Sequence, residues 1–124
     1  MLKKAITYTD YNGVERTENF YFNLTMAELT EMEAGTVGGY TEMINKIIEA
    51  QDIPTLVKIF KELILKAYGE KSADGKQFRK RNGELAQDFA ETEAYSVLYM
   101  ELATDADKAA EFVNGIIPKQ DKKA

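Results

Sequence analysis

Residues 53–69 read IPTLVKIFKELILKAYG, and this stretch decides the fold of the chain. Pro54 suits the first turn of a helix, where its missing N–H would have no partner in any case. Gly69 suits the position that ends a helix. Between them the apolar residues recur at three- and four-residue steps, which predicts one wide apolar helix face made of Leu56, Val57, Ile59, Phe60, Leu63, Ile64, Ala67 and Tyr68. A face this wide predicts a central helix that packs against more than one neighbour.

The segment before the central helix predicts a β-hairpin over residues 3–22. Its Asn12-Gly13 dipeptide is a strong hairpin signal and is compatible with two registers. One register has a two-residue Asn12-Gly13 turn, and the other has a three-residue loop that pairs Asp10 with Val14. A slip of one residue moves every side chain to the other face. We favour the three-residue loop because it gathers the apolar side chains on one face, namely Ile6, Tyr8, Val14, Phe20 and Phe22.

Further helices are predicted on both sides of the central one. Thr25 and Glu28 form a capping box for a helix that ends near Ala34. Thr104 is expected to cap the last helix and Gly115 to end it. The predicted fold class is α+β and mostly helical, with the N-terminal hairpin packed on about five α-helices from about residue 25 onward. We expect a single domain over residues 1–118 and a frayed charged tail over 119–124.

The composition limits the chemistry that the chain can perform. It holds no cysteine and no histidine. This excludes disulfides, thiolate chemistry, most zinc sites and any Ser-His-Asp or Cys-His pair. Asp105 and Asp107 resemble the start of a calcium loop, but the glycine and the glutamate that should follow are missing, and helix capping explains both residues. We expect no enzymatic activity, no catalytic or metal-ligating residue and no cofactor.

The net charge of −5 disfavours nucleic-acid binding by the surface as a whole. No apolar run is long enough for a signal peptide or for a membrane-spanning helix, so we expect no contact with a membrane.

Positive charge is concentrated directly after the central helix. Residues 71–81 contain five cations and one acid, whereas acids dominate residues 82–112. Three interpretations remain open: a solvated loop balanced by the acidic helices, a surface that steers a protein partner, and a nucleic-acid site. The third has the least support because the run contains a single aromatic residue. The candidate partner-binding residues here are Lys71, Lys76, Phe78, Arg79, Lys80 and Arg81.

Apolar residues near the C-terminus form a second set of candidates. Tyr99 and Met100 exceed what one narrow helix stripe needs, so they belong either to a second core helix or to an exposed contact. Phe112, Ile116 and Ile117 either fold back onto the core or form an apolar hook for a partner.

Three stretches of the chain resemble a known family. They are KKAITYTDYNGVERTENFYFNLTMAEL (3–29), LVKIFKELILKAYGEKSADGKQFRK (56–80) and TEAYSVLYMELATDADKAAEFVNGIIP (92–118). They are similar to phage tail assembly chaperones, small cytoplasmic proteins of long-tailed phages and prophages of Gram-positive bacteria. The resemblance covers nearly the whole chain and rests on the overall sequence pattern, not on a catalytic motif. It therefore assigns no function to any individual residue.

The resemblance implies a protein without enzymatic activity that acts in the host bacterial cytoplasm. It implies binding to the tape measure protein and to tail tube subunits, which keeps a long helical protein soluble until the chaperone leaves. Two rival functions remain: a structural tail or head-tail protein retained in the virion, and a small nucleic-acid-binding regulator that uses residues 71–81. The sequence leaves open whether the chain forms a homo-oligomer.

Overall fold

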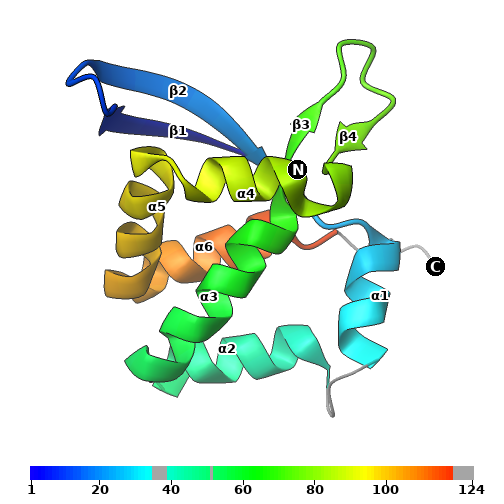
Figure 1. Cartoon of the computed structure of the whole chain (residues 1–124). Helices are drawn as coiled ribbons and strands as arrows, with labels where there is room; N and C mark the ends of the chain where they lie inside the picture. Colours follow the sequence, from blue (N-terminus) through cyan, green and yellow to red (C-terminus); the bar gives the residue numbers. More distant parts are fainter. Residues whose placement is uncertain (35–38, 51, 119–124) are drawn as a thin grey trace.

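The computed structural model describes residues 1–34, 39–50 and 52–118, and it confirms the α+β, mostly helical fold class (Figure 1). The helices lie beneath the N-terminal hairpin, and the central helix runs diagonally through the molecule (Figure 1). The predicted tail over 119–124 lies outside the described residues. In chain order the elements are β1 (Leu2–Thr9), β2 (Glu15–Phe22), α1 (Met26–Ala34), α2 (Tyr40–Ala50), α3 (Ile53–Ala67), β3 (Tyr68–Lys71), β4 (Phe78–Arg79), the 3-10 turn η1 (Arg81–Gly83), α4 (Glu84–Ala90), α5 (Glu93–Thr104) and α6 (Ala106–Ile116).

The β1–β2 hairpin has the predicted three-residue loop. The Asp10 N–H donates to the Val14 carbonyl over 2.9 Å, and Gly13 adopts the left-handed conformation at φ 82°. The register places Ile6 and Phe22 on the face toward the helices, where both side chains are buried. Val14 lies at the end of the hairpin that projects past the helices, and its side chain is 52% exposed. The apolar face is therefore buried or partly buried along the strands and exposed at the tip.

The polar stretch after α3 forms a second hairpin, which the sequence did not predict. β3 pairs with β2, and β4 pairs with β3, so the sheet has the order β1-β2-β3-β4. The central helix ends at Ala67, and Gly69 belongs to β3. A Cβ on Gly69 would lie 2.6 Å from the Phe78 ring and 2.8 Å from the Arg79 carbonyl oxygen. Gly69 follows the C-cap residue Tyr68, as predicted, but it does not have the positive φ of a glycine that ends a helix, and its lack of a Cβ permits close strand packing.

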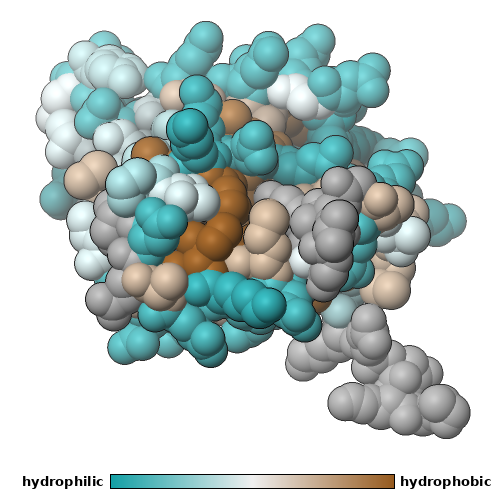
Figure 2. Space-filling model, turned by 90° about the horizontal axis from the view of Figure 1, so that it is seen from below, coloured by the Kyte–Doolittle hydropathy of each residue, from teal (hydrophilic) through white to brown (hydrophobic). Residues whose placement is uncertain are grey.

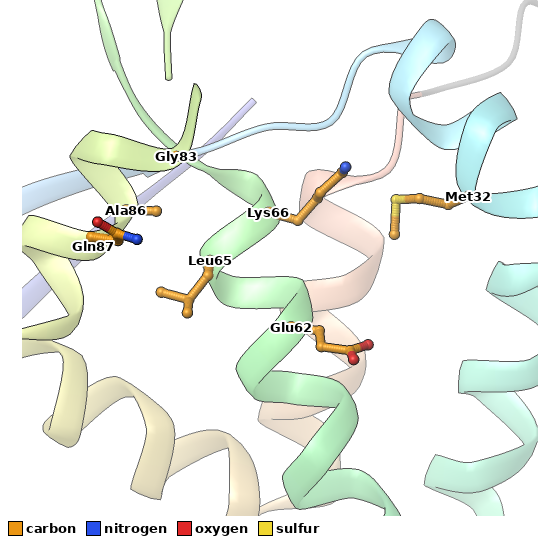
Figure 3. A pocket seen from close by; sticks show the side chains of 7 residues that line it. All are labelled: Met32, Glu62, Leu65, Lys66, Gly83, Ala86 and Gln87. Carbon is orange, nitrogen blue, oxygen red and sulfur yellow. The ribbon is translucent and has the colours of Figure 1, made fainter. Parts of the chain in front are cut away.

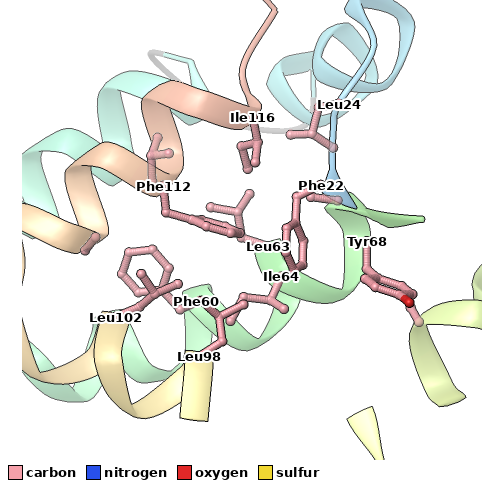
Figure 4. Packing of buried hydrophobic residues seen from close by; sticks show 14 of the residues in the cluster. Phe22, Leu24, Phe60, Leu63, Ile64, Tyr68, Leu98, Leu102, Phe112 and Ile116 are labelled. Carbon is pink, nitrogen blue, oxygen red and sulfur yellow. The ribbon is translucent and has the colours of Figure 1, made fainter. Parts of the chain in front are cut away.

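The α3 helix forms the centre of the core, as its sequence predicts. Phe60, Leu63 and Ile64 are each at most 1% exposed and belong to one cluster with side chains of the hairpin, α5 and α6 (Figure 4). Burial of side chains of this size contributes roughly 1.5–3 kcal/mol each before the cost of ordering them.

Aromatic rings connect the sheet to the helices. The Phe22 ring lies edge-on to Tyr68, Phe89 and Phe112, with centroid distances of 5.7, 5.8 and 5.3 Å. Tyr68 and Phe89 are stacked at 4.4 Å. Such pairs contribute about 0.5–1.5 kcal/mol beyond the burial of their area. They hold β3 against α4 and so fix one side of the candidate site.

The last helix differs from the prediction at both ends. Asp105, and not Thr104, is its N-cap, because the Asp105 carboxylate accepts from the N–H groups two and three residues later, at 3.0 and 3.2 Å. The helix continues through Gly115 to Ile116. A Cβ on Gly115 would lie 2.9 Å from a Leu2 methyl carbon, so this glycine provides room for β1 instead of ending the helix.

Candidate partner-binding groove

A groove lies between α1, α3 and α4, with a volume of about 540 Å³. In Figure 3, Leu65 projects from α3 toward Ala86 and Gln87 of α4, while Glu62 points to the side of α1 that carries Met32. The groove therefore has an apolar interior and polar side chains at its margins. An apolar side chain from an amphipathic segment of a partner fits this chemistry. The lining residues are Met32, Glu62, Leu65, Lys66, Gly83, Ala86 and Gln87.

A second cavity of about 390 Å³ adjoins the groove toward β4. The two share Leu65, Lys66 and Gly83. The second cavity is additionally lined by Glu28, Tyr68, Lys80 and Asn82. The two cavities together give a concave surface along the C-terminal half of α3.

Lys80 ties together the elements that form the second cavity. Its ammonium group donates to the Asn23 carbonyl at 2.9 Å, to Glu28 Oε2 at 2.8 Å and to the Lys66 carbonyl at 2.8 Å. These acceptors use all three of its N–H donors. The Lys66 carbonyl lies in the last turn of α3, where carbonyls lack partners within the helix. Lys80, the residue directly after β4, thus connects this part of the chain to α1, to the end of α3 and to the connection between β2 and α1.

Burial shifts the pKa of both members of this ion pair. Burial lowers the pKa of the Lys80 ammonium, and its hydrogen bond to Glu28 offsets only part of the effect. Burial raises the pKa of the Glu28 carboxyl, but the hydrogen bonds from Lys80 and from the Thr25 N–H outweigh it and leave the pKa below its usual value. The pair is partly removed from water, which strengthens the attraction between its charges.

A left-handed turn follows Lys80 and leads into α4. Arg81, Asn82 and Gly83 have φ values of 51°, 57° and 87°. Glycine adopts this region freely and asparagine tolerates it, whereas arginine rarely does. The Gly83 N–H closes the turn on the Lys80 carbonyl at 3.0 Å. Arg81 therefore has a strained backbone conformation, and it lies two residues before Gly83, which lines the groove.

The predicted basic residues are divided by the structure. Lys71, Lys76, Arg79 and Arg81 are exposed, and the β3–β4 hairpin projects from the body of the molecule (Figure 1). Residues 70–81 contain five cations and two acids, a net charge of +3, so the rest of the chain carries −8. The hairpin is a positive projection on an acidic protein.

Two of the predicted residues in this stretch have structural contacts instead. Lys80 is held by the hydrogen bonds described above, and its ammonium lies 5.8 Å from the centre of the Phe78 ring. Phe78 is partly buried where β4 approaches Gly69. Neither side chain projects freely from the hairpin.

The tip of the β3–β4 hairpin is held by its own side chains. Ser72 is buried, and its hydroxyl donates to Asp74 Oδ1 at 2.7 Å and accepts from the Gln77 N–H at 3.0 Å. Asp74 also accepts from the Lys76 N–H at 3.0 Å. The basic side chains are therefore carried on an ordered turn.

The predicted apolar candidates lie mostly inside the protein. Phe112 and Ile116 are 2% and 0% exposed, and Ile117 is partly buried against the core. The Tyr99 hydroxyl donates to the Val57 carbonyl at 3.1 Å, which ties α5 to α3. Met100 is exposed. Of the two interpretations, the C-terminal residues therefore follow the one in which they fold back onto the core.

Apolar residues are also visible on the face of the molecule that carries α2. Seen from below, this face has a hydrophobic area in a hollow between hydrophilic borders (Figure 2). Met43 and Ile47 of α2 and Ile59 of α3 are partly buried apolar residues that pack against the core.

Sequence reasoning missed the groove residues of three separate helices. Among these residues, only Leu65 could have been singled out from the sequence as a surface contact, because it is an apolar residue outside the main apolar stripe of α3. Met32 and Ala86 reach the same concave surface only because α1 and α4 lie on opposite sides of α3 (Figure 3).

Within the described ranges, no helix is sufficiently long and apolar to cross a membrane. The same residues contain no cluster of three or more acidic side chains placed to hold a metal ion.

A family model described as phage tail assembly chaperone matches residues 1–124. No curated protein and no solved structure matches the chain. The family match spans every element described above, including the groove and the basic hairpin.

Proposed function

Since the chain belongs to the phage tail assembly chaperones, we propose that it binds the tape measure protein and tail tube subunits reversibly in the host bacterial cytoplasm. The family indicates a non-enzymatic role in tail assembly. The family match is the observation that carries this proposal, and the groove supplies a surface of suitable chemistry.

The groove suits an amphipathic helix of the tape measure protein. Such a helix presents apolar side chains at three- and four-residue spacing, and each needs a concave apolar site beside polar groups. The groove offers Leu65, Ala86 and Met32 for apolar contact, with Glu62 and Gln87 at its margins. Its volume of about 540 Å³ accommodates a few side chains and not a whole protein surface. A contact of this size favours release, which a chaperone that leaves the assembled tail requires.

The basic hairpin favours clients with acidic segments. Lys71, Lys76 and Arg79 are exposed on it, close in the chain to the residues that line the second cavity. Exposed charges act mainly on the rate and selectivity of encounter, and salt screens them. We expect the hairpin to direct an acidic client toward the groove.

Co-expression with the tape measure protein of the same phage tests the proposal. The soluble fraction of the tape measure protein should rise when this chain is present. Leu65→Lys should abolish most of the gain, because it places a charge in the groove. Val14→Lys is the matched control, since it replaces an exposed apolar residue at the distant hairpin tip. Equal solubility of the tape measure protein with and without this chain would disprove the function, and equal loss in both variants would disprove the groove assignment.

The composition of purified virions tests release. Mass spectrometry should find no stoichiometric copies of this chain. Stoichiometric copies in the particle would instead indicate a structural tail protein.

A further inference from the structure

One free edge of the sheet, formed by β1, is a surface that the groove does not explain. β1 is an edge strand, and it is eight residues long. It pairs with β2 along its whole length without a bulge and contains no proline. Bulges, prolines and short length are devices by which proteins protect an edge from pairing with another chain. β1 has none of these three.

The register shows which backbone groups point away from β2. The Asp10 N–H donates to the Val14 carbonyl, so the residues at every second position before Asp10 also bond to β2. The residues between them direct their N–H and C=O groups to the free side. These residues are Lys3, Ala5, Thr7 and Thr9.

The side chains at these positions favour pairing. All four are exposed on the face opposite the helices. Lys3 is the only charged one, and it lies near one end, whereas Ala5, Thr7 and Thr9 are small or β-branched. The two lysines of β1, Lys3 and Lys4, both lie near one end of the strand, so the rest of this edge is weakly protected against strand addition.

We propose that β1 pairs antiparallel with β1 of a second copy of this chain, so that the two sheets join across a two-fold axis. Such a contact is self-complementary. With the axis beside Ala5, Lys3 lies opposite Thr7, and with the axis beside Ile6, Lys3 lies opposite Thr9. In neither register does a lysine face a lysine, so like-charge repulsion across the junction is avoided.

The helix beneath β1 supports a second copy as the occupant. The α5 residue Glu101 forms an ion pair with Lys4 of β1 at 2.8 Å. Val97 lies four residues earlier in the same row of α5 and is 43% exposed, and Met100 is 54% exposed. A two-fold axis perpendicular to the sheet places both α5 helices on the same face, where Val97 can meet its counterpart. An isolated extended peptide added to β1 would leave Val97 in water.

Sedimentation of the purified chain over a range of concentrations is the first test. The wild-type chain should form a dimer of twice 14.0 kDa. Thr7→Lys should abolish the dimer, because it places a charge in the middle of the edge that pairs. Thr17→Lys is the matched control: Thr17 pairs with Thr7, their hydroxyls lie 2.9 Å apart, and both substitutions remove that contact. A monomeric wild type at millimolar concentration, or equal behaviour of the two variants, would overturn the proposal.

Amide hydrogen exchange locates the contact. The N–H groups of Ala5 and Thr7 should become protected as the concentration rises, whereas those of Ile6 and Tyr8, which bond to β2, should be protected throughout. Val97→Lys should weaken the dimer without altering exchange in the monomer. Protection of Ala5 and Thr7 that needs an added tail protein would show that the edge binds another chain and would overturn the second-copy assignment. The assay uses this chain alone, so its outcome is independent of the chaperone function.

Discussion

Replacement of Lys80 by methionine tests the connection that holds the second cavity together. The substitution removes three hydrogen bonds, to Glu28, Asn23 and Lys66, while keeping an apolar chain of similar length. Hydrogen bonds that involve a charged group contribute about 1.5–3 kcal/mol each. The Lys80 and Glu28 side chains remain 21% and 25% exposed, so water replaces part of the loss. We expect a decrease of about 2–3 kcal/mol in the free energy of unfolding, or roughly 10 °C in Tm.

Urea unfolding followed by circular dichroism measures this change. Lys76→Met is the matched control, because Lys76 is exposed on the same hairpin. A double-mutant cycle with Glu28→Gln should give a coupling energy of about 1 kcal/mol between Lys80 and Glu28. If Lys80→Met and Lys76→Met differ by less than about 0.5 kcal/mol, Lys80 does not join these elements as described.

Three further predictions concern stability. Gly69→Ala should lower the free energy of unfolding by about 1–3 kcal/mol, because the new Cβ overlaps the Phe78 ring, and a neutral result in urea unfolding would contradict that packing. Arg81→Gly should raise it by about 0.5–1 kcal/mol, because relief of left-handed strain exceeds the added entropy of the unfolded chain, and a lower Tm would refute the strain. The folded pKa of Glu28 lies below its ordinary value of 4.5, so its contribution is present above that value and disappears as the pH falls through the folded pKa. Acid unfolding of Glu28→Gln should therefore be less steep than that of the wild type, and identical curves would exclude this contribution.

Local signals predicted the elements well where their cause is local. The hairpin register follows from two local features. Gly13 adopts the left-handed conformation easily because it is a glycine, and the apolar residues alternate along the strands. The Thr25 and Glu28 capping box is present, with reciprocal hydrogen bonds of 2.9 and 3.1 Å. The apolar period of α3 likewise predicted a central buried helix.

Glycine positions were misinterpreted where the cause is tertiary. Gly69 and Gly115 have the sequence appearance of helix ends. One instead permits contact with β4, and the other makes room for Leu2 of β1. Some glycines are needed because a residue distant in the chain leaves no room for a Cβ. The sequence alone does not distinguish such a glycine from one that ends a helix.

The candidate site was predicted only in part. The basic run is visible in the sequence because charge depends on composition alone, and four of its five cations are exposed. Lys80 is the exception, because its three acceptors come from residues 14, 52 and 57 positions away. Hydrogen-bond partners this far away in the chain cannot be predicted from a local sequence pattern.

The sequence by itself determined the fold class, the hairpin register, the central helix and, through its resemblance, the chaperone family that the match over residues 1–124 supports. These features depend on the periodicity of apolar residues, on turn residues and on the overall sequence pattern. Only the tertiary structure decided that Phe112 and Ile116 are core residues, that Leu65 lines a groove and that β1 is a free edge. Residues 53–69 illustrate the difference: their apolar period predicts a buried helix face, but the positions of α1 and α4 decide which part of the helix surface lines the groove.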